Sequence, residues 1–146
     1  MKKSLFVLIL LFSMPLLAQV ESEKPKSEQS EACCQKDRLD ILWTSGEKEV
    51  FTKVVYPYSL NSRKMGWWKE VSIIVWGPSS KLLSEDSELQ DLIGKLKENG
   101  VILTACKWCS DQYEVSDKLK TLGIDVKYMG KPLTEYLKSG HKVLVF

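Results

Sequence analysis

The chain has 146 residues, with 21 Lys or Arg against 19 Asp or Glu, which gives a formal net charge of +2 at pH 7. The basic residues are interspersed with acidic ones, whereas phosphate binding needs clustered positive charge. The composition therefore argues against a nucleic-acid partner.

Residues 1–18 predict a secretory signal peptide. Two lysines precede an apolar run over residues 5–17, and Ala18 supplies the small residue at the expected cleavage site. The run is shorter than the roughly 20 apolar residues of a membrane-spanning helix, and Ser13 and Pro15 interrupt it. We therefore expect export to the periplasm with no stable membrane anchor after cleavage. An uncleaved anchor is the less favoured alternative.

Residues 19–36 predict a flexible, charged linker that carries Cys33 and Cys34. The stretch from 21 to 31 contains no large apolar residue, so it cannot contribute to a core. The remaining residues, 37–146, have the size of one ordinary domain and show no internal repeat.

The first half of this domain predicts two strands with a helix between them. The runs LDILW at 39–43 and VSIIVW at 71–76 are typical of strands covered on both faces. The stretch 47–63 favours a helix, and Pro57 is expected to break or kink it because proline lacks the amide hydrogen that a helix interior needs. The loop GPSS at 77–80 follows the second strand directly.

The clearest helix is predicted over residues 87–100. Its leucines and isoleucine recur at helical spacing, Ser87 and Gln90 match a capping box, and Asn99 with Gly100 supplies the stop.

The second half repeats the alternation. A strand at 101–105 precedes a helical pattern that ends at Gly123, and a weaker, near-edge strand follows at 124–129. A short helix at 132–140, with a proline in its first turn, leads to a last apolar strand at 142–146.

Strands that alternate with helices predict an α/β fold with a mostly parallel five-stranded sheet and helices on both faces. Ligands of such sheets bind outside the carboxyl ends of the strands. Cys106 follows the strand at 101–105 without an intervening residue, and the loop at 77–80 lies in the same relation to its own strand. Both loops are thus expected at the functional edge.

Cys106 is the predicted nucleophile of the chain. A free cysteine is only about 3% ionised at pH 7, but a helix N-terminus and a neighbouring cation, here Lys107, favour the thiolate. We expect Cys106 to be activated in this way and open to small reagents at the rim of the domain. Cys109, one helical turn further on, is a candidate resolving thiol.

Two other roles are open to the four cysteines. Exported proteins commonly oxidise their cysteines, and four cysteines allow three disulfide patterns, which include bridges from Cys33 and Cys34 to Cys106 and Cys109. A four-thiolate metal site is disfavoured because zinc ligand pairs are usually spaced by two to four residues, whereas Cys33 and Cys34 are adjacent. We expect no metal and no cofactor.

A thioredoxin-type oxidoreductase is a further alternative, since it also places Cys-x-x-Cys at a strand-to-helix junction. In that family the motif comes early in the domain and a cis-proline loop follows, whereas the only later proline here, Pro132, is expected to open a helix. The single histidine, His141, precedes the last strand and is expected to be a surface residue and not a ligand or base.

The order of these elements resembles that of the DsrE/DsrF-like sulfur-handling proteins. The resemblance covers about residues 38–146 and depends on three pieces: WGPSS after the second strand, LTACKWC at Cys106, and LKTLGIDVKYMGKPLTEYLKSGHKVLVF at the end.

The resemblance implies a three-layer, flavodoxin-like fold, assembly into homo-trimers or hexamers, and a cysteine that carries sulfur as a persulfide. The matching position is Cys106, which would exchange sulfane sulfur with donor and acceptor proteins or small sulfur compounds, as a carrier more than as a turnover enzyme. Cys109 matches a second cysteine of some relatives. The same likeness makes a short set of residues candidates for the surrounding pocket: Trp76, Gly77, Pro78, Lys107 and Trp108.

Glu114 departs from the family pattern. Relatives often have a glycine at this position, where the helix after the cysteine bends, and a positive φ costs a non-glycine residue about 1 kcal/mol or more. The bend is therefore expected to differ in this chain.

Overall fold

The computed structural model describes residues 37–146. The predicted signal peptide, the linker, and Cys33 and Cys34 lie outside the described residues. In chain order the elements are β1 Arg38–Trp43, α2 Lys48–Val50, a π-helical turn η1 Phe51–Val55, α3 Tyr56–Lys64, β2 Glu70–Val75, α4 Pro78–Glu85, α5 Ser87–Glu98, β3 Ile102–Cys106, α6 Lys107–Gln112, α7 Ser116–Thr121, β4 Asp125–Lys127, α8 Gly130–Lys138 and β5 Lys142–Val145.

The five strands form one sheet in the order β4-β3-β2-β1-β5, and every pairing is parallel. This confirms the predicted α/β, flavodoxin-like architecture. The chain steps in one direction from β1 to β4 and then crosses back to place β5 on the other side of β1. Because parallel crossovers are right-handed, the reversal puts the last helix on the opposite face from the earlier ones.

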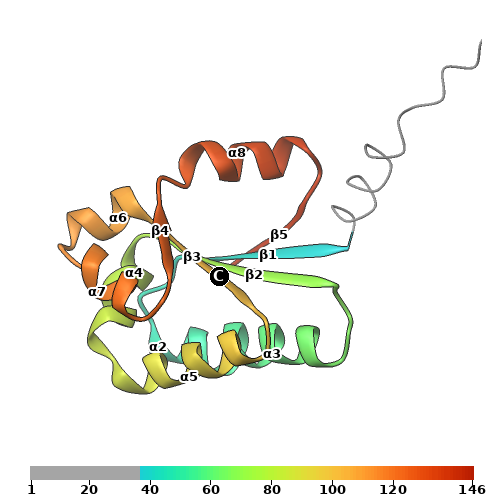
Figure 1. Cartoon of the computed structure of the whole chain (residues 1–146), viewed down its shortest axis with the longest axis horizontal. Helices are drawn as coiled ribbons and strands as arrows, with labels where there is room; N and C mark the ends of the chain where they lie inside the picture. The colour runs from blue at the N-terminus through green and yellow to red at the C-terminus, as the bar shows by residue number, and fades with distance from the viewer. Residues whose placement is uncertain (1–36) are drawn as a thin grey trace, which may run out of the picture.

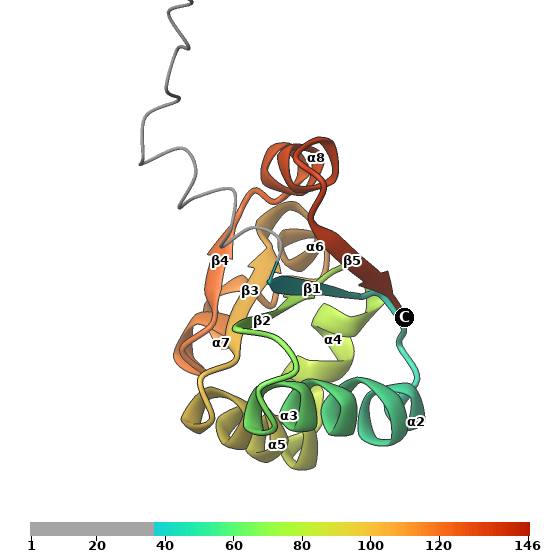
Figure 2. The same ribbon diagram turned by 90° about the vertical axis from the view of Figure 1, so that its right-hand side faces the viewer.

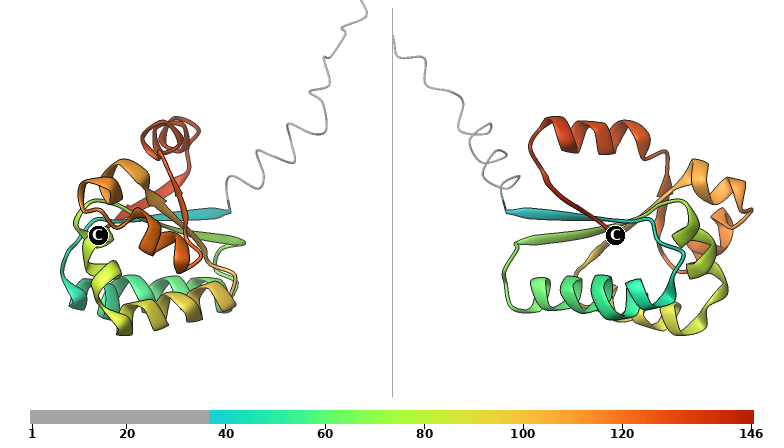
Figure 3. Two further views of the ribbon diagram at one scale, coloured as in Figure 1. Left: turned by 60° about the vertical axis from the view of Figure 1, so that its left-hand side comes forward. Right: turned by 180° about the vertical axis from the view of Figure 1, so that it is seen from behind.

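The layers follow from this topology. Helices α2, α3 and α5 cover one face of the sheet, whereas α8 lies over the other face (Figure 1). Figure 2 views α8 end-on, above the strands and on the opposite side from α3 and α5, and both views of Figure 3 agree. The short helices α6 and α7 lie at the end of the sheet where β3 finishes.

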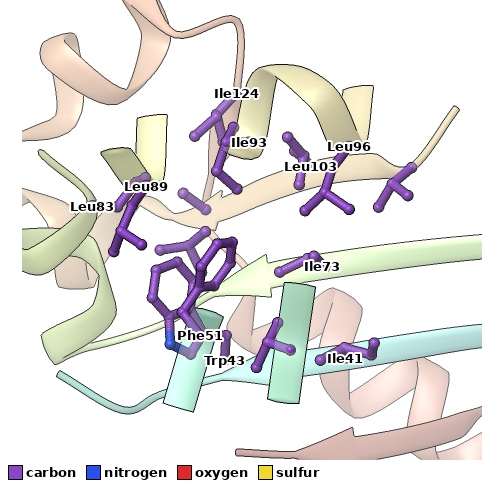
Figure 4. Packing of buried hydrophobic residues seen from close by; sticks show 14 of the residues in the cluster. Ile41, Trp43, Phe51, Ile73, Leu83, Leu89, Ile93, Leu96, Leu103 and Ile124 are labelled. Atoms are coloured by element: carbon purple, nitrogen blue, oxygen red, sulfur yellow. The ribbon is translucent and has the colours of Figure 1, made fainter. Parts of the chain in front are cut away.

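The main core lies between the sheet and α2, α3 and α5. Alternate strand residues point into it, among them Ile41, Trp43 and Ile73, and they meet the apolar side of α5 (Figure 4). The rings of Trp43 and Phe51 have their centroids 4.3 Å apart at its centre. The residues between these point to the α8 face, so Asp40 lies there, fully buried.

One helix prediction is confirmed and another was wrong in detail. As predicted, the stretch 47–63 is not one regular α-helix: the π-helical turn η1, in which the Tyr56 N–H bonds to the carbonyl of Phe51, interrupts it, and Pro57 lies in the first turn of α3. The wider turn gives the proline ring the room that a regular turn denies it. Helix α5 is capped by Asp86, which accepts a hydrogen bond from the Leu89 N–H at 3.1 Å, and not by a Ser87 box.

The predicted helix after Cys109 is divided in two. Helices α6 and α7 are separated by Glu114, which has a φ of 56° and is the one non-glycine residue with positive φ between 37 and 146. The expectation that this bend differs was wrong: the bend forms in spite of the missing glycine. The last helix, α8, begins at Gly130, two residues before Pro132.

Candidate functional site

Cys106 is the last residue of β3 and the N-cap of α6, and Cys109 lies in the first turn of that helix. Both are free thiols in the structure. The fold thus brings the two predicted sulfur residues together at the carboxyl edge of the sheet. Because β3 runs directly into α6, two cysteines only three residues apart lie close together.

Cys109 interacts with Cys106 and with the loop after β2. Burial raises the pKa of Cys109, and its hydrogen bond and charge interaction with Cys106 raise it further. A backbone N–H of Gly77 that points at the Cys109 sulfur acts in the opposite direction without reversing the shift. Cys109 therefore keeps its proton to a higher pH than an ordinary thiol does.

Gly77 connects the second predicted loop to the thiols. Its φ of 68° and ψ of −132° lie where only glycine is comfortable, and Pro78 follows as the first residue of α4. The conformation aims the Gly77 N–H at Cys109. Trp76, directly before it, packs half-buried against the same cluster of side chains.

The expectation of an open thiol was wrong. Cys106 is only 3% exposed and Cys109 only 5%. They form a small apolar cluster with Ile74 and Met129, and two residues of α8, Leu133 and Tyr136, pack over it. The physical reason is the crossover to β5, because the start of α8 passes over the end of β3 and covers both sulfurs.

Lys107 and Trp108 are not among the side chains that pack around the two thiols. The Lys107 ammonium pairs with the Asp111 carboxylate and lies 5.5 Å from the centre of the Tyr128 ring. Its hydrogen bond to Asp111 raises the pKa of Lys107. The Lys107 ammonium is therefore engaged by Asp111, and Trp108, which is 63% exposed, is not among the residues packed around the two cysteines.

A cavity of about 260 Å³ opens next to this site but does not contain it. It lies between the loops after β1 and β2 and the bend after α6, and its lining residues are Gly46, Pro78, Lys81, Leu82, Glu85 and Tyr113. Of the predicted pocket residues only Pro78 takes part. Neither cysteine lines the cavity.

Residues 37–146 contain no group of three or more Cys, His, Asp or Glu side chains arranged to hold a metal ion. A four-thiolate site would need Cys33 and Cys34, which lie outside this range. No helix within the described range has the length and apolar character to cross a membrane.

Comparison with known proteins gives two solved structures. A conserved protein of unknown function from Bacteroides thetaiotaomicron is 42% identical, with a TM-score of 0.74 over 76% of this chain and 96% of that one. The chain belongs to the same family as this Bacteroides protein. No protein-family model and no curated protein sequence matches the chain.

The second structure is YchN from Escherichia coli. It matches with a TM-score of 0.60 over 75% of this chain and 99% of YchN, at 16% identity. At that identity the likeness establishes the fold alone. It agrees with the flavodoxin-like α/β architecture described above.

One group of residues was missed by sequence reasoning. His141 is not a surface residue, because its side chain is 6% exposed and its Nδ1 lies 2.8 Å from Oδ2 of the buried Asp40. Arg38 donates to the other oxygen of the same carboxylate at 2.8 Å. The signal was present in the run LDILW, since a carboxylate inside an apolar strand needs a cationic partner.

Covalent geometry limits the role of Cys33 and Cys34 in the same chain. Asp37 is fixed at the start of the sheet, where its carbonyl accepts two backbone hydrogen bonds. Three or four residues reach at most roughly 11 to 14 Å, and a disulfide adds roughly 7 Å between Cα atoms. The strand register puts Cys106 far along the sheet from Asp37 and two strands to the side, a distance of roughly 25 Å at the usual strand dimensions. Cys106 of the same chain is therefore out of reach of a disulfide to Cys33 or Cys34.

Proposed function

We propose that this protein carries sulfane sulfur as a persulfide on Cys106, with Cys109 as the resolving thiol. The observation that carries the proposal is the placement of two free, buried thiols side by side where β3 runs into α6. Burial raises the pKa of Cys109, so Cys109 is the thiol that keeps its proton, and we assign the nucleophile to Cys106. The DsrE-like fold and the position of Cys106 at the carboxyl edge of the sheet support the same assignment.

In the loading step the Cys106 thiolate attacks the outer sulfur of a donor persulfide, R–S–SH. A bond forms between Cys106 Sγ and that sulfur, the donor S–S bond breaks, and the thiolate R–S⁻ leaves with the electron pair. An acceptor thiolate then removes the outer sulfur in the same manner and regenerates the Cys106 thiolate. Neither transfer changes the total number of electrons on the protein.

Cys109 provides a second outcome. When its thiol loses its proton and attacks Cys106 Sγ of the persulfide, a Cys106–Cys109 disulfide forms and hydrogen sulfide leaves as HS⁻. The protein is thereby oxidised by two electrons, so a thiol reductant has to restore it before another cycle. The raised pKa of Cys109 makes this attack slow at neutral pH, which preserves the persulfide for transfer.

We further propose that the protein works after export, in the periplasm, as a homo-oligomer. The apolar N-terminal run, with its lysines and the small residue after it, motivates the first part. The second part is motivated by exposed apolar side chains on residues 37–146, which include Met65, Trp67, Trp108, Tyr128 and Val145. Its partners in sulfur transfer are thiols and persulfides, either on proteins or on small molecules.

The proposal is tested by incubating the reduced protein with polysulfide and locating added sulfur by peptide mass spectrometry. We expect a mass increase of about one sulfur atom on the Cys106 peptide, and none in Cys106→Ser. Cys109→Ser is the matched variant, and it is expected to load normally and to hold the persulfide longer. A wild-type protein that fails to load Cys106, or a Cys106→Ser variant that loads equally, contradicts the proposal.

The same pair of thiols favours one second candidate, a dithiol oxidoreductase. In that case the reduced protein transfers two electrons to a disulfide substrate and forms the Cys106–Cys109 disulfide without any persulfide stage. Turnover of insulin disulfides at a rate that Cys109→Ser abolishes supports this candidate, whereas sulfur loading that survives Cys109→Ser supports the carrier. An inert Cys106–Cys109 bridge that resists mild reductant, by contrast, points to a binding module with structural disulfides.

A further inference from the structure

The buried thiols and the helix above them suggest how access to the site is controlled. We infer that α8 is a hinged cover over Cys106 and Cys109, and that a cluster at its far end, formed by Arg38, Asp40, Tyr136 and His141, holds it closed. We call this group the latch cluster. The inference rests on the proposed function in one respect only, since it explains how a sulfur compound reaches a thiol that the closed structure buries.

One side of α8 forms the cover. Met129, Leu133 and Tyr136 follow each other at spacings of four and three residues, so they share one face of the helix. Met129 is fully buried against the two cysteines and Ile74, and the other two pack over the same cluster. Figure 2 shows α8 lying over this face of the sheet. Displacement of α8 therefore removes Met129, Leu133 and Tyr136 from above the two sulfurs.

The helix is weakly attached along its length. None of the residues from Gly130 to Lys138 is fully buried, and Leu137 is 59% exposed. An element with so little buried apolar surface opens at a lower free energy than the core does. The main core lies on the opposite face of the sheet, so it stays intact when α8 moves.

The floor beneath α8 lowers the cost of opening. Ser72 and Thr104 lie two residues before Ile74 and Cys106 on their strands, and therefore point to the same face. Both hydroxyls are buried and have no hydrogen-bond partner within residues 37–146. Water that enters as α8 lifts supplies the missing hydrogen bonds, which partly offsets the loss of apolar packing.

The latch cluster attaches the carboxyl end of α8 to β1. Helix α8 ends in a Schellman motif: Gly140, with a φ of 81°, donates its N–H to the Leu137 carbonyl, and the His141 N–H bonds to the Tyr136 carbonyl. This turn stacks the His141 imidazole on the Tyr136 ring, with centroids 4.7 Å apart and planes 5° from parallel.

The same cluster continues into the sheet. His141 reaches the Asp40 carboxylate, Arg38 pairs with that carboxylate and with Glu70, and the Arg38 guanidinium lies 5.0 Å from the centre of the Tyr136 ring. Burial lowers the pKa of Arg38, but the hydrogen bond and charge of Asp40 outweigh it and the net shift is upward. Arg38 therefore neutralises Asp40 by itself, and removal of His141 leaves no unpaired buried charge.

The inference is tested by the rate at which N-ethylmaleimide labels Cys106 and Cys109 in the reduced full chain, read by peptide mass spectrometry. The wild type is expected to label slowly. His141→Ala is expected to label about tenfold faster or more, the effect on an opening equilibrium of losing a hydrogen bond to a charged group. Leu137→Ala, an exposed site on the same helix, is the matched control and is expected to leave the rate unchanged.

A second measurement separates opening of α8 from unfolding. In the wild type, amides of α8 are expected to exchange with solvent faster than those of β1 and β2, and maleimide labelling is expected to depend on denaturant far less steeply than global unfolding does. Labelling that has the full unfolding dependence overturns the inference, as does an unchanged rate in a folded His141→Ala protein. Because maleimide is not a sulfur donor, neither result depends on whether Cys106 accepts sulfur.

Discussion

The backbone N–H of Gly77 points at the sulfur of Cys109, so the loop after β2 and the helix after β3 meet at one thiol. Gly77 holds this position with φ and ψ values that a residue with a Cβ adopts only under strain. The contact connects two loops that the sequence places 32 residues apart, from position 77 to position 109.

Gly77→Ala is therefore expected to act through backbone conformation. No atom lies within 4 Å of the position that the alanine methyl group would take, so the expected loss of about 1 to 3 kcal/mol in unfolding free energy comes from φ and ψ alone. Movement of the N–H is expected to raise the pKa of Cys109 further, measured by the pH dependence of its alkylation. Gly94→Ala is the control: it is also uncrowded but lies in α5 with ordinary φ, and should stabilise the protein by about 0.5 to 1 kcal/mol.

The raised pKa of Cys109 predicts a pH dependence of stability. In the unfolded chain the thiol ionises at its usual pKa of about 8.5, whereas the folded protein keeps it protonated to higher pH. The unfolding free energy of the reduced protein should therefore fall as pH rises above that value. Denaturant unfolding at several pH values checks this expectation.

Cys109→Ala should remove this part of the pH dependence, and Cys106→Ala should reduce it. The second variant deletes the hydrogen bond and charge of Cys106 but leaves the burial of Cys109, which is the larger cause of its raised pKa. Equal slopes in all three proteins would contradict the assignment of Cys109 as the proton-holding thiol.

Glu114→Gly is expected to stabilise the protein by about 1 kcal/mol, because a residue with a Cβ is strained at a φ of 56° and glycine is not. Thermal or denaturant unfolding measures the change. Glu114→Ala removes the same carboxylate without relieving the backbone, so it should give no such gain. A gain shared by both variants would trace the effect to the side chain.

The small number of residues between Cys33 or Cys34 and Asp37 limits which disulfides the oxidised protein can form within one chain. Under non-reducing conditions, peptide mapping of monomeric protein should find no link between Cys33 or Cys34 and Cys106. Links of that kind are expected, if at all, only in covalent dimers or larger species, which a non-reducing gel separates. Their presence within a monomer would mean that β1 does not begin where the structure has it.

The sequence predicted the strands of the sheet well, but it did not predict that α8 covers the two cysteines. The strands at 39–43 and 71–76 are apolar on both faces, a pattern that few other structures share, and the structure places them within one residue. The pairing of Cys106 with Cys109 was equally local. The solvent accessibility of the two cysteines could not be predicted locally. It depends on where α8 crosses the sheet, and the sequence pattern does not indicate which strand a distant helix covers.

The positive φ of Glu114 and the π-helical form of the turn before Pro57 were not predicted from the sequence. Local rules disfavour a glutamate at positive φ and a proline inside a helix. In both places the flanking segments are packed into the protein. Phe51 and Val55 are buried before Pro57, and Ser116 and Leu119 are buried after Glu114. The tertiary contacts of these residues outweigh the free-energy cost of the disfavoured backbone conformations.

The strand order has one more consequence. Because β4 and β5 are the two margins of the sheet, the polypeptide that joins them must travel across its whole width, and α8 is the one helix between them in the chain. Shielding of the sulfur pair is thus a product of chain routing more than of any particular side chain. Homologues that keep this routing should screen the equivalent position even where their last helix has a different sequence.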